Sequence, residues 1–110
     1  MSFTTHVRDD VAVIAISGRF DAQSAPSVAE WLEHIAATTP GRVVVNLADA
    51  SFLDSSALAV LVRVVKRCRM RGGDVRLSGI QPSVRLIFEL TRLDRAFDMF
   101  ASEDEAVGSF

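Results

Sequence analysis

The sequence has few of the residues from which disulfide frameworks and metal sites are built. It contains one cysteine, Cys68, and two histidines, His6 and His34, among 110 residues. A single cysteine excludes an internal disulfide, and one thiol alone cannot make a zinc site. We therefore expect a fold that depends on its apolar core and a protein that needs no metal or other cofactor.

A large excess of either charge is also missing. The formal net charge is −2 at pH 7 and the pI is about 5.6, whereas proteins that bind nucleic acid directly usually carry a basic excess. The basic run from Arg63 to Arg71 is expected to be a solvated helix face. No apolar run approaches the roughly 20 residues needed to cross a bilayer, and the first residues lack the pattern of a signal peptide. We expect a cytoplasmic protein without membrane insertion.

The composition that remains is that of a globular domain. Hydrophobic residues make up 49% of the chain and charged residues 24%, with six glycines and three prolines. A chain of this length buries about two-thirds of its unfolded surface, which is enough for a core without covalent staples. We expect one domain over residues 1–110, with its core at about 4–107.

The apolar periodicity predicts alternating strands and helices. Strands are expected at 3–8, 11–16, 43–47, 74–78 and 97–100, and helices at 25–39, 57–70, 83–90 and 103–107. Asp9 and Asp10 are expected to form a hairpin turn, and Ser24 to cap the first helix ahead of Pro26. This order predicts an α/β fold, a mixed sheet of about five strands whose later strands run parallel, with helices packed against it.

Motifs of common catalytic sites are absent. There is no G-x-S-x-G, H-E-x-x-H, Walker loop or G-x-G-x-x-G. Gly72 and Gly73 follow a predicted helix and read as its stop, while Cys68 lies on an apolar helix stripe and is expected to be an inert core thiol. Asp49 and Asp54 flank an apolar segment, and aspartates of this kind usually cap and solvate a turn. We expect no enzymatic activity.

The segment around residues 52–58 allows two interpretations. Phe52 and Leu53 stand in a predicted connection, and Asp54, Ser55 and Ser56 follow at the start of a helix. In the structural interpretation, Asp54 or Ser55 caps the helix and an apolar neighbour packs as a staple. In the functional interpretation, the exposed hydroxyl is phosphorylated, which adds about −1.5 to −2 charge. The helix dipole tolerates that charge, whereas a partner docked over the turn does not.

Three motifs, in this order, resemble the STAS domain of bacterial anti-sigma factor antagonists. They are Gly18-Arg19-Phe20-Asp21, Val44-Val45-Asn46-Leu47-Ala48 and Phe52-Leu53-Asp54-Ser55-Ser56-Ala57-Leu58. The resemblance runs from about Thr4 to Val107 and rests on the combination of motifs. It implies that the unphosphorylated protein binds an anti-sigma factor that is also a serine kinase and thereby frees a sigma factor. Phosphorylation by the kinase, which brings ATP and Mg²⁺, would release the antagonist, and a serine phosphatase would restore it.

The resemblance also assigns roles to residues of this chain. It implies phosphorylation of Ser55 and a partner-binding surface made of Asp21, Asp54, Ser55, Ser56, Ala57 and Leu58. Ala57 departs from the family pattern, which usually has glycine there. Alanine favours the helix by about 1 kcal/mol, and we expect its methyl group to crowd a partner. If so, Ala57→Gly would keep the fold and raise association with the cognate kinase.

A second function is compatible with the same resemblance. An accessory STAS subunit, for example of a lipid-transport ATPase, or a stress-signalling scaffold would use the same helix face constitutively. Phosphoryl transfer to Ser55 separates the two functions, because constitutive binding does not require it. For either function we expect a monomer or a weak homodimer.

Overall fold

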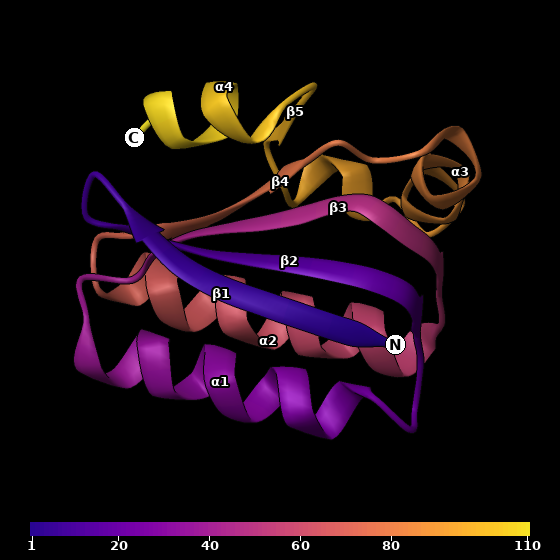
Figure 1. The fold of residues 1–110 in the computed structure, drawn as a ribbon, viewed down its shortest axis with the longest axis horizontal. Coiled ribbons are helices and arrows are strands. Elements are labelled where there is room, and N and C mark those ends of the chain that lie inside the picture. The colour runs from indigo at the N-terminus through magenta and orange to yellow at the C-terminus, as the bar shows by residue number, and fades with distance from the viewer.

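Apolar β-branched runs form the centre of a five-stranded sheet in the computed structural model, which describes residues 1–110 (Figure 1). The strands are β1 (Ser2–Arg8), β2 (Val11–Phe20), β3 (Arg42–Leu53), β4 (Asp74–Ser78) and β5 (Met99–Phe100). They lie in the order β1-β2-β3-β4-β5; β1 is antiparallel to β2, and the other neighbours are parallel. The predicted mixed α/β sheet with parallel later strands is confirmed.

Helices cover both faces of this sheet. They are α1 (Ala25–Thr38), α2 (Ser55–Met70), α3 (Pro82–Leu90) and α4 (Glu103–Gly108), with a 3₁₀ turn, η1 (Leu93–Arg95). Figure 1 shows α1 and α2 side by side under one face, with α4 on the opposite side and α3 near the end of β3. The buried side chains of α3, Val84 and Phe88, belong to the same core as those of α1 and α2. The larger core lies between the sheet and α1 and α2, and it contains 24 buried residues. A smaller apolar cluster fixes α4 to the opposite face.

Glu103 ties α4 to the strands through polar contacts. Its carboxylate accepts hydrogen bonds from Arg8 of β1 (2.8 Å) and Asn46 of β3 (3.2 Å), and it lies 3.3 Å from the ring nitrogen of His6. Burial raises the pKa of Glu103, but these three hydrogen bonds outweigh it and hold the pKa below its usual value of 4.5. The ionised carboxylate is therefore the form that stabilises this contact.

The turn between β1 and β2 has the expected form. Asp9 and Asp10 both adopt positive φ, at 50° and 65°. Two consecutive residues in this left-handed region are typical of a two-residue turn whose twist matches that of an antiparallel hairpin. Aspartate tolerates that conformation better than most residues.

Two strands extend further than the sequence pattern predicts. β2 continues from the expected end at residue 16 to Phe20, and β3 continues from residue 47 to Leu53. They remain paired because the register shifts between Ala15 and Ser17 and again after Gly18, whose φ is +83°. These irregularities break the apolar pattern without breaking the ladder. Phe52, Leu53 and Asp49 are thus strand residues, and their expected place in a connection or turn is wrong.

The remaining boundaries shift by one or two residues. α2 begins at Ser55, two residues before its expected start, and β5 is limited to Met99–Phe100. Phe97, expected in that last strand, is buried instead and packs edge-on against Phe88 with ring centroids 5.9 Å apart. Cys68 is buried as expected, and burial raises the pKa of its thiol.

Candidate functional site

The extra length of β2 and β3 brings two loops together at their carboxyl ends. Phe20 and Leu53, the last residues of the two strands, are paired in the sheet. The backbone N–H of Asp54 donates to the carbonyl oxygen of Phe20 at 3.3 Å. The loop after β2 and the first turn of α2 therefore form one continuous surface.

The carboxylate of Asp54 joins these two segments. Its Oδ1 accepts a hydrogen bond from the backbone N–H of Ala57 at 3.0 Å, and its Oδ2 accepts one from the backbone N–H of Ala22 at 3.0 Å. The first contact is the N-cap of α2, because it satisfies an amide that the helix itself leaves free. Of the two residues expected to cap this helix, Asp54 and Ser55, Asp54 makes the capping hydrogen bond.

Asp21 lies in the neighbouring loop, as expected. Its carboxylate accepts a hydrogen bond from the backbone N–H of Gln23 at 3.1 Å and lies 3.8 Å from Nε of Arg19. The hydroxyl of Ser24 accepts from the N–H of Asp21 and donates to the carbonyl of Arg19. Ser24 occupies the N-cap position of α1 as expected, but its side chain makes no capping hydrogen bond, because it turns back to hold the loop.

Ser55 is the first residue of α2 and is exposed, and its hydroxyl makes no hydrogen bond to the protein. Ser56, beside it, is half-buried. The backbone amides at this helix end carry partial positive charge. The site thus presents one free hydroxyl at a helix N-terminus whose cap is supplied by another residue.

Ala57 and Leu58 differ from the expectation for a contact surface. Ala57 is 0% exposed and belongs to the core between α2 and the sheet. Its methyl group therefore points away from any partner and cannot crowd one, contrary to the expectation from the sequence. Leu58 is 7% exposed and lies at the border of the core, where it reaches the surface described next.

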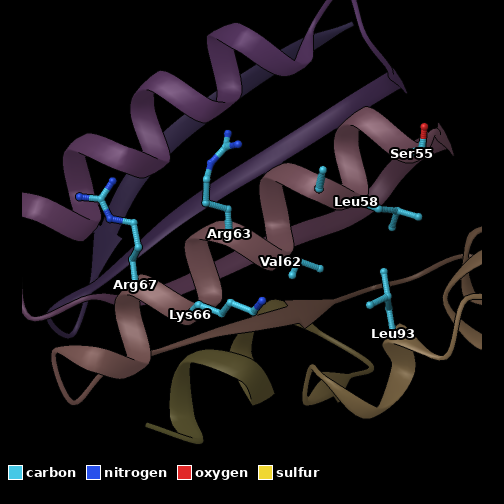
Figure 2. A pocket seen from close by; sticks show the side chains of 8 residues that line it. Ser55, Leu58, Val62, Arg63, Lys66, Arg67 and Leu93 are labelled. Carbon is cyan, nitrogen blue, oxygen red and sulfur yellow. The ribbon is translucent and has the colours of Figure 1, made fainter.

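An open groove of about 680 Å³ runs along α2 from Ser55 (Figure 2). It is lined by Ser55, Leu58, Ala59, Val62, Arg63, Lys66, Arg67 and Leu93. Apolar side chains of α2 and η1 occupy the part near Ser55, and basic side chains occupy the far end. The helical spacing of 55, 59, 62 and 66 was visible in the sequence, whereas Leu93 comes from a distant segment that only the fold brings close.

Groups that could hold a metal ion or span a membrane are absent. No cluster of three or more His, Cys, Asp or Glu side chains is placed to bind a metal. No helix combines the length and the apolar character that crossing a bilayer requires. What the site offers chemically is a hydroxyl that can accept a phosphoryl group beside a surface that can bind a protein.

Several proteins of known name are similar to this chain in sequence and in fold. The anti-sigma-B factor antagonist of Listeria monocytogenes is 32% identical over 97 residues, which is 87% of this chain and 84% of that protein. The crystal structure of an anti-sigma factor antagonist from Mycobacterium paratuberculosis has a TM-score of 0.88 at 25% identity, covering 98% of this chain and 92% of that one. A longer Mycobacterium tuberculosis relative is 37% identical over 71 residues, and the chain spans 48% of its length.

SpoIIAA of Bacillus shares the fold in both of its solved states. The structures of its unphosphorylated and phosphorylated forms each have a TM-score of 0.79, at 20% and 21% identity, and each match covers 98% of this chain. The sequence profile of the STAS domain matches residues 2–106. This chain belongs to the STAS domain family.

Proposed function

We propose that this protein is an anti-sigma factor antagonist that binds an anti-sigma factor serine kinase and is released when Ser55 is phosphorylated. The observation that carries the proposal is the exposed Ser55 hydroxyl, free of hydrogen bonds, at the start of α2. It stands beside the surface that Asp54 assembles from two loops. The protein is then a substrate and a binding module, and the kinase supplies ATP and Mg²⁺.

The change in binding follows from charge and desolvation. Unphosphorylated Ser55 leaves a surface with Asp21 and Asp54 nearby and an apolar groove alongside. A phosphate adds about −1.5 to −2 charge at pH 7. The kinase would have to strip water from that group to dock, and close to two carboxylates the cost exceeds what a neutral hydroxyl requires. Release of the antagonist leaves the kinase free to hold its sigma factor.

Names of the relatives support this function over a constitutive one. Proteins that cover most of this chain are anti-sigma factor antagonists, and SpoIIAA exists in a phosphorylated form. An accessory subunit of a transporter, which would bind without phosphorylation, is not favoured by these relatives. A serine phosphatase completes the cycle in the cytoplasm, and the antagonist acts as a monomer or a weak homodimer.

The partner surface comprises Asp21, Asp54, Ser55, Ser56 and Leu58, continuing into the groove along α2. Ala57 contributes through the packing of the helix start, because its side chain is buried. Phosphorylated Ser55 would lie at one end of this surface.

The test is phosphoryl transfer combined with binding. A serine kinase captured by the wild type from native lysate is purified and incubated with ATP and each variant. We expect labelling of the wild type and loss of label in Ser55→Ala, and we expect Ser55→Asp to bind the kinase more weakly. Ser83→Asp is the matched control, since Ser83 is also exposed in the first turn of a helix, α3. Equal binding of Ser55→Asp and wild type would refute the switch.

A further inference from the structure

Lys66 differs from every other basic residue in the groove. It is the only lysine in the chain, which otherwise uses arginine for its basic residues. Its side chain is exposed and belongs to no ion pair, whereas Arg63 and Arg67 both bind the carboxylate of Glu33 on α1, with Arg63 Nε at 3.0 Å. Figure 2 shows Arg63 and Arg67 extended toward α1, while Lys66 extends along α2 beside Val62.

The far end of the groove therefore carries net positive charge. Arg63 and Arg67 share the one carboxylate of Glu33, and Lys66 has no acidic partner, in a chain whose net charge is −2. Between this end and Ser55 the groove is lined by Leu58, Ala59, Val62 and Leu93. An occupant that matches both features is an amphipathic segment with an apolar side chain and, farther along, a carboxylate.

This cationic end is distant from the phosphorylation site. Eleven residues of α2 separate Ser55 from Lys66, which is about 16 Å at 1.5 Å per residue. That exceeds the Debye length of about 8 Å at physiological ionic strength. A charge contact at Lys66 would therefore change little when Ser55 acquires a phosphate.

We propose that Lys66 binds an aspartate or glutamate on an amphipathic segment of the kinase, whose apolar side chains occupy the groove near Leu58, Val62 and Leu93. The inference rests on the proposed function, since it identifies the chemistry of the same partner. The contact sets which kinase is chosen and how fast it associates, because a partly exposed charge pair acts on encounter more than on final affinity. The state of Ser55 sets whether the complex persists.

A single lysine makes the contact directly testable. A carbodiimide couples an amine to a carboxylate in contact with it, and Lys66 is the only side-chain amine in the protein. With the purified kinase that phosphorylates Ser55, we expect a cross-linked peptide pair joining Lys66 to an aspartate or glutamate of the kinase. Lys66→Arg keeps the charge but offers no amine, so it should bind normally and lose the cross-link.

Binding measurements test the same contact of Lys66 in a second way. Lys66→Glu should slow association of the kinase and thereby weaken binding about tenfold at low salt, with a smaller loss at high salt, as attraction becomes repulsion at an exposed site. Arg85→Glu is the control, because Arg85 is exposed on α3 and has no ion pair. Wild-type affinity in Lys66→Glu, or a cross-link to the N-terminal amine alone, overturns the inference while Ser55 labelling still supports the proposed function. If no kinase labels Ser55, the proposed function fails, and the partner named here fails with it.

Discussion

Replacing Asp54 by alanine should destabilise the protein more than any change at Ser55. The substitution removes two hydrogen bonds, to the backbone N–H groups of Ala57 and Ala22, each 3.0 Å long. Loss of an N-cap costs about 1 kcal/mol, and loss of a second bond to a charged acceptor costs about 1.5 kcal/mol at the low end of its range. Because Asp54 is only half-buried, water recovers part of this, and we expect a loss of about 2 kcal/mol in the free energy of unfolding.

Urea and thermal unfolding measure this loss. For a domain of this size, about 2 kcal/mol lowers Tm by roughly 8–16 °C. Asp54→Asn keeps a neutral acceptor for one amide and should lose less, whereas Ser55→Ala should stay within about 0.5 kcal/mol of the wild type. An Asp54→Ala variant as stable as the wild type, or an equal loss in Ser55→Ala, would refute the division of roles between the two residues.

Four other substitutions test the packing of the site and of the rest of the fold. Ala57→Gly should lower the free energy of unfolding by about 1 kcal/mol without raising kinase affinity, because its methyl group is buried; denaturation and binding assays check both. Glu103→Gln should lower Tm at pH 7, and the difference in Tm from the wild type should shrink as the pH falls below 4.5. The reason is that the pKa of Glu103 is lower in the folded protein than in the unfolded chain, so the ionised carboxylate stabilises the fold above the unfolded-state pKa and this stability is lost on protonation. Gly73→Ala should unfold more easily than Gly72→Ala, because a Cβ at Gly73 would overlap the backbone of Gly41. At Gly72 nothing lies within 4 Å of a Cβ, and the cost is the backbone strain of a φ of +83°, about 1–2 kcal/mol.

Local patterns predicted the fold well where one physical cause dominates. The central strands are β-branched and apolar, and the two long helices have a clear apolar stripe, so burial alone identifies them. The cap of α2 was also predictable, because Asp54 precedes an apolar helical pattern and aspartate is a favoured N-cap residue. The structure adds only the choice between Asp54 and Ser55.

Features that arise where two distant segments of the chain meet could not be predicted from the sequence of either segment alone. β2 and β3 extend past their apolar runs because each provides a partner for the other across the register shifts. Ser24 fits the sequence pattern of a cap, but the loop around Asp21 and Arg19 uses its hydroxyl instead.

The separation of the cap from the proposed phosphorylation site explains how a serine here could change charge while the fold persists. An N-cap side chain bends back onto a free amide of the first turn, whereas the side chain of the next residue points away from the helix. If Ser55 were the cap, a phosphate on its oxygen would replace the contact that begins α2. Asp54 makes that contact instead, so a phosphate on Ser55 adds negative charge where the helix dipole favours it. Phosphorylation should then change what the surface binds and leave Tm nearly constant, a combination that requires these two roles to fall on neighbouring residues.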